Sequence, residues 1–151
     1  MDAGTKTAPD GAELEQRVSL ITLGVADPAR SRKFYEDLGW RAAFQNEEIV
    51  FFQLNGLVLG LFRRESFDHD MKRDNDGSGR VALAYNVRER AEVDPLLERA
   101  VAAGGSLLKA AEEAPWGGYS GYFADPDGHA WEIAHNGAWA IDAAGNISME
   151  G

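Results

Sequence analysis

Apolar residues along the chain fall into two similar series of short runs, separated by a polar stretch. The first series opens with the β-branched run VSLITLGV at 18–25, which predicts a buried strand. The second series opens in the same way with VALAYNV at 81–87. Each opening run is followed by a segment with apolar residues at helical spacing, and then by three further short runs. The pattern predicts two copies of a strand–helix–three-strand unit.

Start and stop signals mark the two predicted helices. An Asp-Pro pair, at 27–28 and again at 94–95, supplies an N-cap followed by proline in the first turn. A glycine, Gly39 or Gly104, follows the last apolar residue of each segment and suits the C′ position. Both helices are therefore predicted to be amphipathic and to cover one face of a sheet.

Hairpin turns separate the strands that follow each helix. Asn55-Gly56 lies in the first unit and Asp127-Gly128 in the second, and both dipeptides are strong hairpin signals. The expected fold class is α+β, with two tandem βαβββ modules forming a curved mixed sheet around a central cup and the helices outside. The strands expected after the helices cover 40–45, 49–54, 57–62, 106–110, 119–124 and 130–134.

The amino-acid composition of the intervening segments indicates where each module begins and ends. Residues 1–16 are polar and without sustained periodicity, which predicts a flexible tail. Residues 65–79 are dense in charged and turn-forming residues, which predicts a linker or a long surface loop between modules at 17–64 and 80–136. Residues 137–151 hold two short apolar segments around a turn-like stretch, which predicts a small terminal hairpin or arm.

The overall composition excludes several classes of protein. The chain has 151 residues, 15 Lys+Arg against 25 Asp+Glu, a net charge of −10 and no cysteine. The acidic balance disfavours nucleic acids and anionic membranes as partners. The absence of cysteine excludes disulfides, thiolate catalysis, Cys-ligated zinc and iron–sulfur clusters. The apolar runs are far shorter than the ~20 residues of a membrane span, and no signal peptide is visible. We therefore expect a soluble cytoplasmic protein.

Two motifs extend this pattern to a known family. They are LGVADPARSRKFYEDLGW at 23–40 and GYFADPDGHAWEIAHN at 121–136, the second with a glutamate four residues after the D-P-D-G glycine. The chain resembles the vicinal oxygen chelate superfamily, which includes glyoxalase I, extradiol dioxygenases, and the fosfomycin- and bleomycin-resistance proteins. The resemblance covers about 18–136 and is nearest to glyoxalase-like members with a stretch like WGGYSGYFADPDGH, here at 116–129.

The resemblance implies a divalent metal ion held in the cup by four inward-facing His, Gln or Glu side chains. Glu132 occupies one of these positions, and the other three are Leu20, Gly60 and Ala82. A lone carboxylate holds a divalent cation weakly, because such ions require several oxygen or nitrogen ligands together. We therefore expect no metal centre and no cofactor, with a divalent metal at an incomplete site as the alternative.

The three histidines do not rebuild such a site. His129 and His135 lie three residues before and after Glu132, so on an extended strand they point to the opposite face. His69 lies in the predicted linker.

The side chains left to face a ligand are mostly small or apolar. Strand parity with Glu132 and with the empty ligand positions selects most of them, and an aromatic loop at 115–119 adds surface near the mouth of the cup. The predicted ligand-binding residues are Thr22, Val58, Phe62, Ala84, Asn86, Trp116, Tyr119, Tyr122 and Glu132.

Two of these residues have more than one interpretation. Trp116 is either a packing anchor for an irregular loop or a wall against a flat ligand. Glu132 is a structural carboxylate, a ligand-orienting acceptor, or a catalytic general base with a raised pKa.

Three functions remain open at this point. The first is a metal-independent binder of a small aromatic or cationic molecule, similar to the bleomycin-resistance branch. The second is a lyase or isomerase resembling lactoylglutathione lyase, using Glu132 with an incomplete or atypical metal site. The third is a protein whose main role is assembly. The resemblance also implies a homodimer, side by side or with exchanged modules, and Trp139 and Ile141 of the arm offer apolar surface for that contact.

Overall fold

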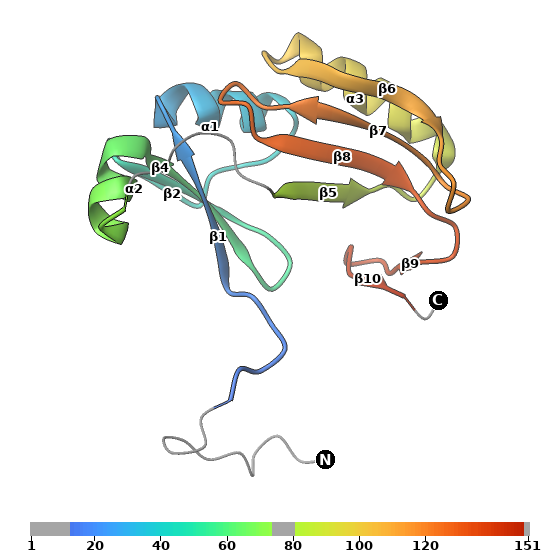
Figure 1. Ribbon diagram of the computed structural model, residues 1–151, viewed down its shortest axis with the longest axis horizontal. Coiled ribbons are helices and arrows are strands. Elements are labelled where there is room, and N and C mark those ends of the chain that lie inside the picture. The colour runs from blue at the N-terminus through green and yellow to red at the C-terminus, as the bar shows by residue number, and fades with distance from the viewer. Residues whose placement is uncertain (1–12, 74–80, 150–151) are drawn as a thin grey trace.

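The computed structural model describes residues 13–73 and 81–149, which include two four-stranded sheets with helices above them and a further helix at one end (Figure 1). The first module contains β1 (Leu20–Val25), α1 (Pro28–Asp37), β2 (Phe44–Gln45), β3 (Ile49–Gln53), β4 (Val58–Arg63) and α2 (Arg64–Met71). The second contains β5 (Ala82–Asn86), the 3-10 turn η2 (Arg90–Glu92), α3 (Val93–Ala102), β6 (Ser106–Glu113), β7 (Tyr119–Ala124) and β8 (Ala130–His135). The chain ends with β9 (Ala140–Ile141) and β10 (Ile147–Ser148).

The two sheets have the same topology. Their strand orders are β1-β4-β3-β2 and β5-β8-β7-β6, and in each the first strand runs parallel to the last while the other pairs are antiparallel. Thr22 lies beside Gly60 in the first sheet, as Ala84 lies beside Glu132 in the second. The predicted α+β class with two tandem βαβββ modules is confirmed.

The first helix begins and ends as its sequence signals predict. The side chain of Asp27 accepts hydrogen bonds from the backbone N–H groups of Ala29 (3.0 Å) and Arg30 (3.3 Å), ahead of Pro28 in the first turn. Gly39 ends the helix with φ +115°, a left-handed conformation that glycine adopts without steric cost.

The second module's helix begins earlier than predicted. Asp94 is not the N-cap, because α3 already includes Val93 and continues from the turn η2. Glu89 and Glu92 form a reciprocal capping box that satisfies the backbone N–H groups of that turn. The carboxylate of Asp94 instead accepts a hydrogen bond from the hydroxyl of Tyr119 at 2.7 Å.

Part of the predicted linker is helical rather than a loop. Arg64–Met71 forms α2, where the ring of Phe67 packs 5.6 Å from that of Phe62 and the hydroxyl of Ser66 donates to Glu48. One apolar anchor thus holds a helix in a segment whose composition is otherwise polar. Residues 74–79 of the predicted linker and 1–12 of the predicted tail lie outside the described residues.

The strands after the helices differ mainly in length from the prediction. The strand expected at 40–45 is reduced to β2, and the strand expected at 106–110 extends to Glu113 with shifts in register. In the C-terminal segment, β9 and β10 pair as a short antiparallel hairpin with Ile147 opposite Ile141.

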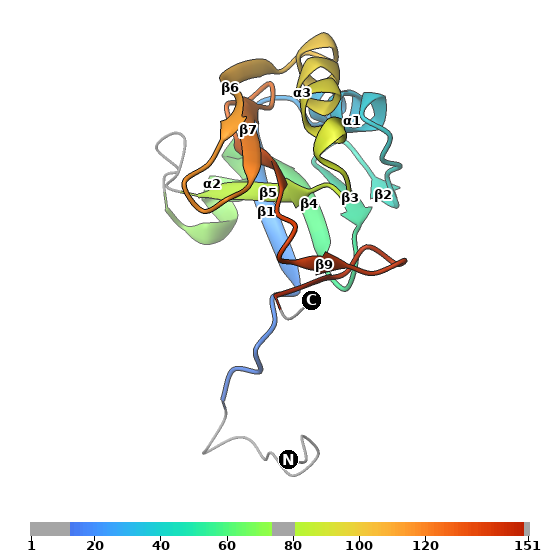
Figure 2. The same cartoon turned by 90° about the vertical axis from the view of Figure 1, so that its right-hand side faces the viewer.

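One hydrophobic core joins the two modules. Figure 2 shows α1 and α3 on the same side of the strands. The ring of Phe34 on α1 lies 6.1 Å from that of Phe123 on β7, and the ring of Tyr35 lies 6.1 Å from that of Trp131 on β8. The first module's helix therefore packs against the second module's sheet as well as its own, and the buried side chains form a single cluster.

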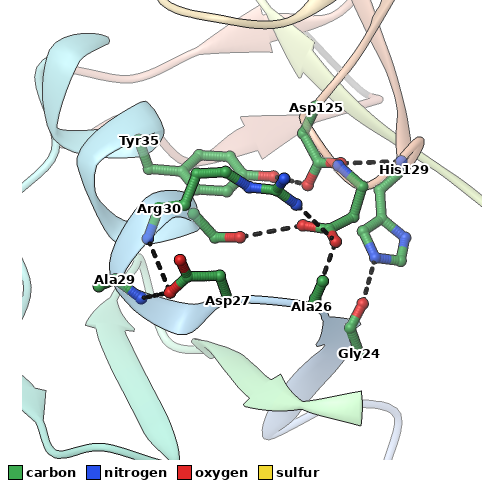
Figure 3. A network of polar contacts seen from close by, with 10 residues as sticks. Gly24, Ala26, Asp27, Ala29, Arg30, Tyr35, Asp125 and His129 are labelled. Carbon is green, nitrogen blue, oxygen red and sulfur yellow. Dashed lines mark hydrogen bonds and ion pairs between the residues drawn. The ribbon is translucent and has the colours of Figure 1, made fainter.

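A polar network fixes the turn between β7 and β8 to the start of α1 (Figure 3). The carboxylate of Asp127 accepts from the backbone N–H of Ala26 (2.9 Å), the guanidinium of Arg30 (3.0 Å) and the hydroxyl of Ser31 (3.0 Å). The side chain of Asp127 is only 6% exposed, so solvent screens these contacts weakly. This side chain is a long-range connection between the modules.

The neighbouring Asp125 anchors a buried hydroxyl. Its carboxylate accepts from the Tyr35 hydroxyl at 2.6 Å and from the backbone N–H groups of Asp127 and His129, and the Trp131 indole N–H donates to the Tyr35 oxygen at 3.1 Å. Burial, together with the charge of Asp125, raises the pKa of Tyr35 well above its ordinary value of 10.0.

Replacing Asp127 tests its role as the connection between modules. We expect Asp127→Ala to lower the free energy of unfolding by about 2–4 kcal/mol, because three donors lose a nearly buried acceptor. The matched control is Asp37→Ala, which removes an exposed carboxylate paired with Lys33 at 2.8 Å on the same helix and should cost about 0.5 kcal/mol or less. Urea unfolding measures both, and equal losses would contradict the assignment.

The buried Tyr35 hydroxyl predicts a pH dependence of stability. Above its ordinary pKa of 10.0, Tyr35 loses its proton in the unfolded chain while the folded protein keeps it, so the free energy of unfolding falls as the pH rises further. We expect Tyr35→Phe to cost about 1–3 kcal/mol near neutral pH and to make this alkaline fall shallower. Urea unfolding at about pH 8 and about pH 11 measures the difference, and parallel falls in the two proteins would rule out the proposed linkage.

Candidate functional site

Each sheet has a face that points away from α1 and α3, and these two outer faces are where the sequence places the ligand. Side chains alternate along a strand, so register assigns them to faces directly. The first outer face carries Leu20, Thr22, Gly24, Phe44, Ile49, Phe51, Gln53, Val58, Gly60 and Phe62. The second outer face carries Ala82, Ala84, Asn86, Lys109, Glu112, Ser120, Tyr122, Ala124, Ala130, Glu132 and Ala134.

Glu132 occupies the middle of the second outer face. Its neighbours across the strands are Ala84 and Tyr122, and along its own strand they are Ala130 and Ala134. The residue is half-buried, and its carboxylate makes no hydrogen bond or ion pair within residues 13–73 and 81–149. Three of its four neighbours are alanines, and no described residue donates to it, so the carboxylate can receive a donor from a ligand.

On the first outer face, apolar residues surround Gly60, which corresponds in position to Glu132 on the second outer face. A Cβ atom at Gly60 would lie 3.2 Å from the ring of Phe51 and 3.6 Å from a methyl group of Leu20, so these two side chains cover the position. Leu20 and Phe44 remain 46% and 50% exposed, and a cavity of about 370 Å³ runs between them and Val58. This face offers a surface for apolar groups.

The side chains around Glu132 do not form the four-ligand metal centre that the family resemblance implies. In the described parts of the chain, no group of three or more His, Cys, Asp or Glu side chains is placed to hold a metal ion. Pairing the outer faces of two copies would not supply one, because the described first outer face has only Thr22 and Gln53 as polar side chains. On the second, Glu112 already pairs with Lys109 at 3.0 Å. Glu132 thus remains a single carboxylate.

The histidines lie away from Glu132. The Nε2 atom of His129 lies 2.8 Å from the carbonyl oxygen of Gly24, at the junction between the modules. His135 stands three residues from Glu132 on β8, so it points to the other face, and His69 lies on α2.

Two of the predicted ligand-binding aromatic residues lie apart from Glu132. Tyr119 is on the helix side of its sheet, where its hydrogen bond to Asp94 raises its pKa and the Arg90 guanidinium lies 4.0 Å from the ring centre. Trp116 is half-exposed, and its ring folds back onto Gly118 so closely that a Cβ there would collide with it. This contact supports the packing interpretation of Trp116.

Of the predicted residues, Thr22, Val58 and Phe62 share the first outer face, and Ala84, Asn86, Tyr122 and Glu132 share the second. A cavity of about 700 Å³, which sequence reasoning missed, lies between the β3–β4 hairpin, β5 and the C-terminal arm (137–149). Ala84 and Asn86 line it together with Trp40, Arg41, Arg88 and Trp139. No local signal reveals this cavity, because its walls come from segments about 100 residues apart.

Two features define the class of this protein. They are the two βαβββ sheets and the D-P-D-G turn of the second module, which contacts the start of α1 in the first. The chain belongs to the Glyoxalase/Bleomycin resistance protein/Dioxygenase superfamily, whose family model matches residues 17–133. In the described part of the chain, no helix is long and apolar enough to cross a membrane.

Particular relatives share most of its length. A glyoxalase-related enzyme from Fulvimarina pelagi is 47% identical, with a TM-score of 0.87 covering 91% of this chain and all of that one. Metallothiol transferase FosB from Lysinibacillus sphaericus (strain C3-41) is 27% identical over 123 residues, covering 81% of this chain and 83% of its own. A lactoylglutathione lyase from Agrobacterium tumefaciens is 23% identical with a TM-score of 0.65, covering 82% and 96% of the two chains, and shows a common fold alone.

Proposed function

We propose that this protein binds a small molecule with an aromatic body and a cationic group, without a metal ion or other cofactor. The observation that carries the proposal is the carboxylate of Glu132, half-buried among alanines and without a protein donor in the described residues. An ammonium or amidinium group would supply that donor as a charge-assisted hydrogen bond.

Two further properties favour a cationic ligand. The ring of Tyr122 lies beside Glu132 across the strands and is within reach of a cation held by the carboxylate. The net charge of −10 raises the local concentration of cations around the protein.

We propose that a second copy of the chain completes the site. On the first outer face, α2 packs against Phe62, while Leu20 and Phe44 remain about half-exposed. Exposed apolar surface of this kind is typical of contact sites. Placing the first outer face of one copy opposite the second outer face of the other would set an apolar wall against Glu132.

The enzymatic alternative has less support. The relatives include a metallothiol transferase and a lactoylglutathione lyase, but Leu20, Gly60 and Ala82 occupy the positions at which the family resemblance implies metal ligands. The geometry supplies an acceptor for a ligand, and the described residues include no group of three or more His, Cys, Asp or Glu side chains placed to hold a metal ion.

Replacing Glu132 tests the proposed contact. The probe is 2-naphthylmethylamine, whose amine is protonated at neutral pH, titrated into the full chain in a calorimeter. We expect Glu132→Gln to weaken binding by about tenfold or more, because one charge-assisted hydrogen bond is lost. Glu98→Gln, at an exposed position on α3, should stay within about twofold of wild type.

A neutral analogue separates the charge from the ring. Binding of 2-naphthylmethanol should be weak and should not change with Glu132→Gln. Equal binding of the amine by wild type and Glu132→Gln would refute the proposed role of the carboxylate.

Independence of metal ions is a separate prediction. We expect chelator-treated protein to bind the amine as tightly as untreated protein, because the donor set lacks the several ligands that a divalent ion requires. Calorimetric titration with Zn²⁺, Ni²⁺ and Mn²⁺ should show no stoichiometric site. One equivalent of metal in the purified protein, or loss of amine binding after chelation, would argue for the enzymatic alternative.

A further inference from the structure

The C-terminal arm closes a cavity that borders the second outer face at Ala84 and Asn86 but does not include Glu132. Figure 1 shows the β9–β10 hairpin below β5 and close to the tip of the β3–β4 hairpin. The cavity of about 700 Å³ lies between these segments, and Glu132 is not among its lining residues. Its volume is within the range of small-molecule sites, about 300–1,000 Å³.

Polar contacts hold the arm to both modules. The Asn55 amide of the first module donates to the carbonyl of Ala144 and to the side-chain oxygen of Asn146 (3.3 Å). The Arg88 guanidinium of the second module donates to the carbonyl of Asp142 at 2.7 Å. The Asp142 carboxylate accepts from the backbone N–H groups of Ala144 (3.0 Å) and Asn146 (2.8 Å), which makes the arm's turn a formed structure.

The charges on the cavity wall are all positive. Arg41 and Arg88 line it, and the described lining residues include no Asp or Glu, although the chain carries 25 acidic residues against 15 basic ones. Within the part of the chain that the structure describes, neither guanidinium pairs with a carboxylate. Guanidinium groups bind carboxylates, sulfonates and phosphates through two parallel hydrogen bonds, so an anion fits this wall.

The remaining wall is aromatic. The ring of Trp40 stacks on the ring of Tyr35, with 5.5 Å between the ring centres and an 18° angle between the planes. This stacking on a buried side chain fixes the orientation of Trp40. Tyr85 and Trp139 are 46% and 38% exposed beside it. A smaller apolar cavity of about 90 Å³ also borders Trp40 and Tyr85 and extends toward the core. A flat ring placed here would cover aromatic surface that the chain leaves open.

We infer that this cavity is a second binding site, which takes a small aromatic molecule carrying an anionic group. The anion pairs with Arg41 and Arg88, and the ring lies among Trp40, Tyr85 and Trp139. The site does not depend on the proposed function, because it requires a ligand of opposite charge and different charged residues.

Naphthalene-2-sulfonate is the probe that tests this site on the full chain. Calorimetry should show binding that weakens by about tenfold in Arg41→Gln and further in the variant that also carries Arg88→Gln. The matched control Arg99→Gln removes the same charge from α3 and should change binding by about twofold at most. Because Arg88 also holds the arm, Arg41→Gln is the decisive single variant.

Two further measurements locate the ligand. Amide chemical shifts of the arm (139–147) should move on adding the sulfonate, and the neutral naphthalene-2-sulfonamide should bind much more weakly. Binding that is insensitive to Arg41→Gln, equally reduced by Arg99→Gln, or mapped to the strands around Glu132 would overturn the inference. Glu132→Gln should leave sulfonate binding unchanged, so failure of either site is distinguishable from failure of the other.

Discussion

The turn between β7 and β8 holds the two modules together, and the positions of the other elements depend on it. Asp127 accepts three hydrogen bonds from the start of α1, and Asp125 accepts the hydroxyl of Tyr35 from the same helix. These carboxylates are nearly or fully buried, so they are stable as charges only while their donors are in place. The contact therefore sets the position of α1 against the second sheet, and with it the shared aromatic core.

This arrangement determines which surfaces remain for binding. Because the helix-side faces of both sheets meet in one core, the outer faces are left for other contacts, and α2 covers part of the first. One outer face presents Glu132 among alanines, and the other presents Leu20, Phe44 and Phe51. The space left between the modules is closed by the C-terminal arm and has two arginines on its wall. The chain thus places the acidic Glu132 on one surface and the two arginines on another.

Much of the local structure could be predicted because it depends on neighbours in the sequence. The cap at Asp27, the left-handed Gly39 and the opposite faces of Glu132 and His135 all follow from short-range geometry. The prediction was wrong where another contact competed with the local signal. Asp94 would make a good cap, but a Glu89–Glu92 capping box starts the helix one turn earlier.

By itself the sequence determined the duplicated strand–helix–three-strand module and its hairpin turns, since periodicity, turn residues and spacing are local properties. Only the tertiary structure decided that no described residue makes a hydrogen bond or ion pair with the Glu132 carboxylate. It also decided that Phe51 and Leu20 cover Gly60. It also brought Arg41, Arg88 and Trp139 to one cavity. Those features depend on contacts between segments far apart in the chain, which arise when the modules and the arm pack together.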